Sequence, residues 1–143
     1  RIVCTKELAD APVHNGETPL HSCASLNYVE SARVLLSEFG ADIDKRDEDG
    51  RTPLLTGLIY RHAKISKFLI EKGAEVNVVT TKPPLTPLHY AVWMDPWDAE
   101  LTEMLLRKGA NPHAVGVGNG TPWEWAQKKG EIKALFEKYM PSH

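Results

Sequence analysis

The sequence predicts an all-α repeat fold, an α-solenoid of stacked helix-turn-helix units with projecting, β-hairpin-like fingers. The first observation is a Thr-Pro pair that recurs at Thr18, Thr52, Thr86 and Thr121, at separations of 34, 34 and 35 residues. The second is a Gly-Ala pair with the same period, beginning at positions 40, 73 and 109. The third is the helical spacing of apolar residues between these markers. Two markers that share one period through most of a chain are typical of a repeat protein.

Composition places the chain among ordinary globular domains. Its 143 residues are enough for one compact domain, and 42% are hydrophobic and 25% charged. The formal net charge is −2, without the basic face that nucleic-acid binding requires. No apolar run approaches the roughly 18 residues of a membrane span. We therefore expect neither a nucleic-acid partner nor a membrane-spanning segment.

The two cysteines, Cys4 and Cys23, leave the compartment open. No Cys-x-x-Cys pair occurs, which argues against a zinc site or a redox dithiol. The favoured interpretation is that both are small hydrophobic residues, with a cytoplasmic location as the default. The alternative is a Cys4–Cys23 disulfide, which would indicate a periplasmic or secreted protein. The sequence begins with Arg1, so it leaves open whether a signal peptide or further repeats precede it.

The markers divide the chain into repeats within a single domain, 1–143. The first residues resemble an incomplete repeat or an N-terminal cap, because a repeat array needs a cover for its first hydrophobic face. The predicted segments are 1–12 for the partial repeat or cap, 13–45 for repeat one, 46–79 for repeat two, 80–115 for repeat three, and 116–143 for repeat four and the C-terminal cap.

In repeat one, Thr18 is a natural N-cap, and Pro19 suits the first helical position because its missing N–H costs nothing there. The first helix follows, and a second is predicted from about Val29 to Glu38. Gly40 should end the second helix in a left-handed conformation. Residues 41–44 then extend as a finger towards the next turn.

Repeat two follows the same plan, with a first helix to about Tyr60 and a second helix that Gly73 ends. The connection to Thr86 is one residue longer than the corresponding connection in repeat one. It also contains Pro83-Pro84, which removes two backbone donors. These features predict a distorted finger.

Repeat three contains an insertion, Asp95-Pro96-Trp97-Asp98, between its helices. Pro96 and Asp98 should restart the second helix, with Asp98 as its N-cap. Repeat four is atypical, as terminal repeats tend to be, and its glycines are expected to loosen its finger.

The recurrence of Gly-x-Thr-Pro-Leu-His and Gly-Ala-Asp in register resembles the ankyrin repeat family over about residues 13–139. Departures are Leu55 and Glu124 at the histidine position and Gly57 at a usual alanine. The resemblance implies a right-handed stack of helix pairs with fingers at about a right angle to them. It also implies protein–protein recognition on a concave face made of finger tips and first helices.

The histidines do not indicate catalysis. In the resembling family, the histidine that follows Thr-Pro-Leu bonds to the threonine and to the neighbouring loop, which implies structural roles for His21 and His89. His62 matches the family's position between the two helices and is expected to be structural as well. No spacing of His, Cys or Asp suggests a nucleophile set or a metal site. We therefore expect a non-catalytic chain without cofactor or metal.

Apolar residues at positions that the fold leaves exposed are the candidate partner-binding residues, since Trp and Tyr often dominate affinity. The first-helix positions are Leu26, Ile59, Tyr60, Trp93 and Met94. The finger positions are Arg46, Glu48, Asp49, Arg51, Val79, Lys82 and Leu85, with Trp97 in the nearby insertion. The alternative is that Trp93 and Trp97 pack on each other. Trp123 is expected in the core, and Trp125 fits either role.

The leading hypothesis is a protein–protein interaction module, monomeric when free, that binds a folded protein or an extended peptide. The alternative is a dedicated inhibitor or self-protection protein that blocks an enzyme's active-site cleft, inside or outside the cytoplasm. An enzyme or its regulatory part is disfavoured by the missing catalytic residues. A targeting segment of a larger protein also fits the incomplete first repeat.

Overall fold

The computed structural model describes residues 6–116, 118 and 120–140. The chain divides into two compact units, Arg1–Glu75 and Val76–His143, and each is described by itself. Cys4 lies outside the described residues, so its pairing with Cys23 stays a prediction. Cys23 is buried, and burial raises the pKa of its thiol, which is the behaviour expected of a small hydrophobic residue.

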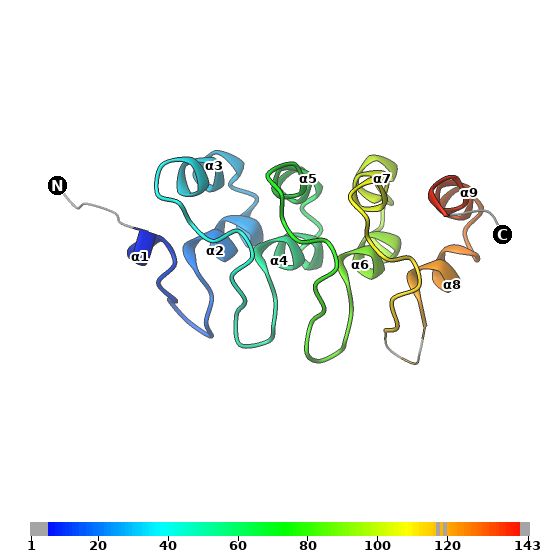
Figure 1. The fold of residues 1–143 in the computed structure, drawn as a ribbon, viewed down its shortest axis with the longest axis horizontal. Helices are drawn as coiled ribbons and strands as arrows, with labels where there is room; N and C mark the ends of the chain where they lie inside the picture. The colour runs from blue at the N-terminus through cyan, green and yellow to red at the C-terminus, as the bar shows by residue number, and fades with distance from the viewer. Residues whose placement is uncertain (1–5, 117, 119, 141–143) are drawn as a thin grey trace. The chain divides into compact units, whose positions relative to one another are not determined.

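The first unit consists of helices joined by turns and fingers (Figure 1). After the short N-terminal helix, two helix pairs follow, and α2 packs closely against α4 while α3 and α5 touch less extensively. The predicted helices of repeats one and two are confirmed to within about one residue. Their bounds are α1 Lys6–Ala9, α2 Pro19–Leu26, α3 Val29–Ser37, α4 Pro53–Ile59 and α5 Ala63–Glu71.

The second unit repeats this arrangement with two further pairs. The first helices, α6 and α8, are neighbours, and so are the second helices, α7 and α9. Asp98 is the N-cap of α7, and its Oδ1 accepts a hydrogen bond from the Leu101 N–H at 3.0 Å, as predicted for the restart after the insertion. The bounds are α6 Pro87–Trp93, α7 Ala99–Arg107, α8 Pro122–Ala126 and α9 Gly130–Tyr139.

Helix ends follow the local sequence. Every Thr-Pro pair places extended threonine before a proline at the first helical turn, so the missing proline N–H leaves no bond unmade. Gly40, Gly73 and Gly109 have φ values of 63°, 94° and 92°, and this left-handed backbone ends each preceding helix without a Cβ clash.

The core of each unit is built from leucines and isoleucines on the facing sides of its helices. In the first unit, Leu54 and Ile65 have no exposed surface, and Gly57 allows α4 to approach α5 closely. A Cβ at Gly57 would lie 2.8 Å from Ser66 Oγ, which explains glycine where the related pattern has alanine. In the second unit, Leu88, Leu101 and Phe136 are fully buried.

The fingers of the described segments are turns rather than strand pairs, since they contain only an isolated bridge, between His14 and Glu17. In the first unit, the buried carboxylate of Asp47 accepts hydrogen bonds from the N–H groups of Asp49 and Arg51, each at 2.9 Å. The Asp47 N–H donates to the Arg51 carbonyl at 2.9 Å and closes the turn. This side chain therefore fixes the finger by satisfying backbone donors.

The finger at residues 79–85 of the second unit is bonded differently, in agreement with the predicted distortion. Thr80 takes the place of aspartate: its N–H donates to the Leu85 carbonyl at 3.0 Å, and its hydroxyl accepts from the Leu85 N–H at 3.0 Å. The Thr80 hydroxyl also donates to the Pro83 carbonyl. The Lys82–Pro83 and Asp95–Pro96 peptide bonds are cis.

Candidate partner-binding surface

Two buried histidines hold the first helices and the fingers in position. In the first unit, the Thr18 N–H donates to His21 Nδ1 at 3.0 Å, and His21 Nε2 lies 2.8 Å from the Arg51 carbonyl oxygen. In the second unit, the Thr86 N–H donates to His89 Nδ1 at 3.1 Å, and His89 Nε2 lies 3.1 Å from the Gly120 carbonyl oxygen. Each imidazole thus joins its own helix cap to the next finger, and the predicted structural role is confirmed.

The same geometry determines the tautomer of His89. Nδ1 faces an N–H group and must accept, so Nε2 carries the proton and donates to the carbonyl. Burial lowers the pKa of His89, and the hydrogen bond to Gly120 opposes that effect. His62 is also structural, because its Nε2 lies 3.0 Å from the Ser25 carbonyl oxygen. The ring nitrogens of His21, His62 and His89 are therefore engaged with the protein's own backbone.

In the first unit, exposed apolar side chains lie at the ends of the two first helices. Leu26 ends α2 and is 55% exposed, and Tyr60 follows α4 and is 57% exposed. Both stand eight residues after their capping threonine, so they occupy the same register of neighbouring helices. Ile59, next to Tyr60, is half-buried.

Charged residues of the finger accompany this surface. Arg46, Glu48 and Asp49 are exposed, and Arg51 is half-buried with its guanidinium 3.7 Å from the Asp49 carboxylate. Such an exposed ion pair contributes little to stability, so these side chains can exchange partners at low cost.

In the second unit, Trp93 and Trp125 form a stacked pair at the ends of α6 and α8. Their ring centroids are 4.5 Å apart and the ring planes differ by 11°. Trp93 is 53% exposed, whereas Trp125 is half-buried beneath it. The edge of the His89 imidazole meets Trp125 at a centroid distance of 4.8 Å and an interplanar angle of 68°.

Two glycines make room for these rings. A Cβ at Gly116 would lie 2.6 Å from His89 Nε2, and a Cβ at Gly120 would collide with the Trp125 indole nitrogen. The Gly116 N–H donates to the Gly120 carbonyl at 2.9 Å. Gly116 and Gly120 therefore bring the backbone close to the rings that support Trp93, and the loosening of this finger by its glycines stays a prediction.

Two predicted binding residues are buried. Met94 is 5% exposed because α6 ends at Trp93 and the backbone at Met94 turns to an extended conformation, with φ −58° and ψ 135°. Leu85 is 1% exposed because its two bonds with Thr80 hold it against the base of the finger. The expectation that both side chains are exposed was wrong, and neither is retained in the candidate surface.

Trp97 bonds to the helix that follows the insertion, and its contact with a partner stays a prediction. Its Nε1 donates to the Thr102 hydroxyl at 2.8 Å, so the half-buried indole is held against α7 instead of packing on Trp93. Val79 is 39% exposed and Lys82 is exposed, as expected. Trp123, expected in the core, is half-buried and faces the ring of Phe136 at 6.2 Å.

Sequence reasoning left Trp125 undecided and therefore missed the support of Trp93. A usable signal is the pairing of large aromatic residues on consecutive first helices, at the seventh position after Thr86 and the fourth after Thr121. Other exposed apolar residues, Tyr28 at 56% and Val13 at 76%, lie in the turn between α2 and α3 and in the first finger.

The helix pairs, the repeated caps and the fingers define an α-solenoid repeat protein. Residues 2–80 and 39–116 match the family described as ankyrin repeats, in three copies, and the chain belongs to this family. Ankyrin repeats are generally protein–protein interaction modules and are typically non-catalytic. In the segments that the structure describes, no helix has the length and apolar character needed to cross a membrane.

The chain is similar to the ankyrin-repeat regions of otherwise different proteins. It is 33% identical over 118 residues to mouse Rabankyrin-5, covering 76% of the chain and 10% of that protein. It is 34% identical over 94 residues to human SMC5-SMC6 complex localization factor protein 1, covering 66% and 9%. It is 32% identical over 116 residues to mouse Neurogenic locus notch homolog protein 1, covering 80% and 4%. The chain thus spans a tenth or less of the length of these relatives.

Proposed function

We propose that the chain is a non-catalytic module that binds a protein partner, a folded domain or an extended peptide, on the concave face of its repeats. In the second unit the principal contact is Trp93, with Lys82 from the finger. In the first unit the proposed contact residues are Leu26, Ile59, Tyr60, Arg46, Glu48 and Arg51.

The observation that carries this proposal is the half-exposed indole of Trp93, held against Trp125. A stacked aromatic pair contributes about 0.5–1.5 kcal/mol beyond the burial of its area. The pair is also fixed by His89 and by the close approach of Gly120. Because the ring is already ordered, a partner that covers it loses little additional side-chain entropy, which favours a high-affinity contact.

Trp97 does not favour the alternative of an inhibitor that inserts a loop into an enzyme's cleft. The indole that would act as the wedge is directed to Thr102 of the chain's own helix α7. The interaction module is therefore the function that the contacts support best.

Affinity capture from the native cell extract, with quantitative mass spectrometry, tests the proposal. Wild type is compared with Trp93→Ala and with Tyr28→Ala, a matched loss of an exposed aromatic side chain in the turn between α2 and α3. We expect a protein that wild type and Tyr28→Ala retain and Trp93→Ala does not, while circular dichroism shows that all three are folded. Equal retention by Trp93→Ala would contradict the proposal.

A further inference from the structure

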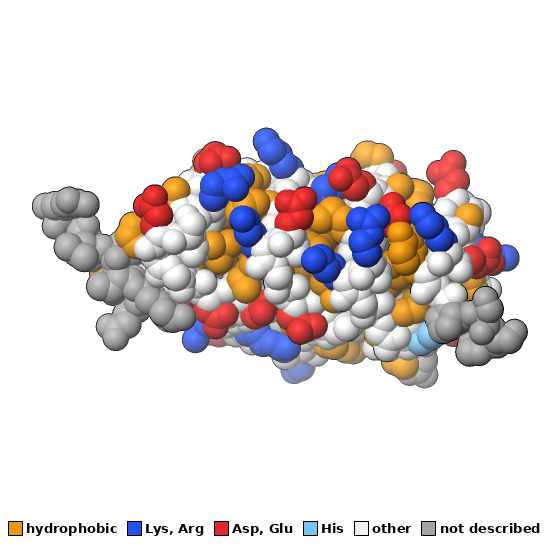
Figure 2. Space-filling model, turned by 45° about the horizontal axis from the view of Figure 1, so that its top comes forward, with side chains coloured by type: hydrophobic (Ala, Val, Ile, Leu, Met, Phe, Trp, Pro, Cys, Tyr) orange, Lys and Arg blue, Asp and Glu red, His pale blue; other side chains and the backbone are white. Residues whose placement is uncertain are grey.

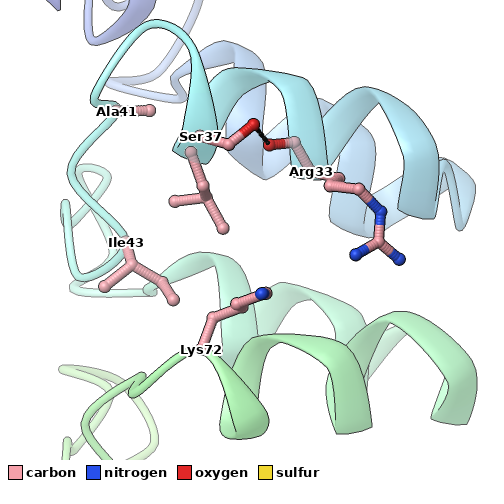
Figure 3. A pocket seen from close by; sticks show the side chains of 6 residues that line it. Arg33, Ser37, Ala41, Ile43 and Lys72 are labelled. Atoms are coloured by element: carbon pink, nitrogen blue, oxygen red, sulfur yellow. Dashed lines mark hydrogen bonds between the residues drawn. The ribbon is translucent and has the colours of Figure 1, made fainter.

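The second helices of the first unit leave a pocket between them. It has a volume of about 350 Å³ and lies where α3 and α5 end. Figure 3 shows its six lining residues, with the long side chains of Arg33 and Lys72 directed into the space between the two helices. The lining residues are Arg33, Leu36, Ser37, Ala41, Ile43 and Lys72.

The two positively charged residues that line this pocket approach the same aromatic ring. Arg33 Cζ lies 4.9 Å and Lys72 Nζ lies 5.7 Å from the centroid of the buried Phe68 ring. Attraction to the ring face holds the cations at the mouth of the pocket but does not neutralise them. The lining contains no acidic residue.

The nearby acidic residue, Glu30, does not satisfy this charge. Its carboxylate lies 3.3 Å from Arg33 Nε, and the two side chains are 83% and 47% exposed. An exposed pair of this kind contributes little, and the guanidinium has further N–H donors beyond Nε. Ser37 donates its hydroxyl to the Arg33 carbonyl at 2.7 Å, which leaves its oxygen lone pairs at the pocket wall.

The second unit has different residues at these positions, and they bond to each other. Counted from the first helical residue, Arg33 of α3 corresponds to Glu103 of α7, and Lys72 at the end of α5 corresponds to Tyr139 of α9. The Tyr139 hydroxyl donates directly to the Glu103 carboxylate, and Lys138 Nζ lies 3.3 Å from it. Donor and acceptor therefore join α7 and α9, whereas two cations at the same positions cannot join α3 and α5.

The apolar part of the pocket limits which anion fits. Leu36 and Ile43 are half-buried, and Ala41 is 9% exposed. A free inorganic anion would leave these groups uncovered, whereas an aliphatic side chain next to a carboxylate would cover them. Figure 2, which views the molecule from the side of the second helices, shows hydrophobic side chains between interspersed acidic and basic ones.

We propose that the pocket between α3 and α5 binds an acidic peptide segment of a partner, with a glutamate or aspartate carboxylate between Arg33 and Lys72 and a neighbouring aliphatic side chain against Leu36 and Ile43. Trp93 is not among the residues that line this pocket. The pocket therefore gives the chain a second docking site, which takes an acidic peptide segment.

The test is an NMR titration of the ¹⁵N-labelled chain with the capped peptide acetyl-Ala-Leu-Glu-Leu-Ala-amide. We expect saturable shifts at the amides of Ser37, Ala41 and Lys72. Replacing the peptide's Glu by Gln should weaken binding about threefold, because one charge contact at a partly exposed site is lost. Arg33→Gln and Lys72→Gln should each have a similar effect, and the peptide should bind more weakly as salt is raised.

Two controls keep the result specific. Lys108 caps the end of α7 as Lys72 caps the end of α5, so Lys108→Gln should bind the peptide as wild type does. Trp93→Ala should also bind it normally, which separates this inference from the proposed function. Equal binding of the Glu and Gln peptides, equal weakening by Lys108→Gln, or the absence of saturable shifts would overturn the proposal. Equally strong shifts with inorganic phosphate alone would overturn the assignment to a peptide.

Discussion

Replacing His89 by alanine tests whether the buried imidazole holds the second unit together. The ring accepts from the Thr86 N–H, lies 2.9 Å from the Thr86 hydroxyl, and donates to the Gly120 carbonyl. His89→Ala removes all three contacts and the edge-on packing against Trp125.

The magnitude follows from the groups left without partners. Thr86 and His89 are both buried, at 3% and 0% exposure, so water cannot easily replace the ring at the Thr86 N–H. An unsatisfied buried donor costs about 1–3 kcal/mol, and the lost packing of a large buried side chain adds a further contribution of similar size. We expect the free energy of unfolding to fall by about 3 kcal/mol, a large part of the roughly 5–15 kcal/mol typical of a domain.

Urea unfolding followed by far-ultraviolet circular dichroism measures this change. His113→Ala is the matched control, because His113 is an exposed histidine in the finger of the same unit, and its loss should change stability by less than about 0.5 kcal/mol. If His89→Ala were as stable as His113→Ala, the claim that the imidazole joins the cap to the finger would be refuted.

Three further predictions concern stability. Gly57→Ala should lower the free energy of unfolding in urea by about 1–3 kcal/mol, because its Cβ would meet Ser66. Gly130 has open space around it, so Gly130→Ala should be neutral or stabilising. Equal effects of the two substitutions would refute the packing argument. Burial lowers the pKa of His89 in the folded state, so the contribution of His89 to the free energy of unfolding is present above the ordinary histidine value of about 6.5 and is lost as pH falls below it. The difference in this free energy between wild type and His89→Gln should therefore shrink in acid, and a constant difference would contradict the prediction. Hydrogen bonds from Tyr139 and Lys138 lower the pKa of Glu103, so Glu103→Gln should reduce the thermal midpoint, most at low salt, and an unchanged midpoint would show that this contact contributes nothing.

The helices could be predicted from sequence because their causes are local. A threonine before a proline starts each of the helices α2, α4, α6 and α8, and a left-handed glycine follows α3, α5 and α7, as Thr86 and Gly109 illustrate. The N-cap role of Asp98 was predictable for the same reason, since a cap depends on residues three positions away.

Side-chain exposure was harder to predict where it depends on distant contacts. Register alone placed Met94 with Leu26 and Tyr60, but the backbone at Met94 is extended where Tyr60 has ψ near 3°, and Met94 is buried. The support of Trp93 by Trp125 depends on the next repeat, 32 residues further along the chain. The two residues stand at different distances from their capping threonines, so the repeat period does not indicate the contact.

The different side chains on the second helices of the two units were also hard to interpret from sequence. Sequence reasoning predicted the second helices but gave no role to Arg33 or Lys72, which are exposed. Their relation appeared only when α3 and α5 were compared with α7 and α9, where Glu103 and Tyr139 bond to each other.

Isothermal titration of the captured partner with wild type and Trp93→Ala tests the central claim most directly. We predict that Trp93→Ala weakens binding by at least about 2 kcal/mol, roughly 30-fold, as expected for an exposed, preordered indole that becomes buried. Tyr28→Ala should leave the affinity unchanged. Dissociation constants for wild type and Trp93→Ala that agree within about twofold, well under 1 kcal/mol, would contradict the assignment of Trp93 as the principal contact.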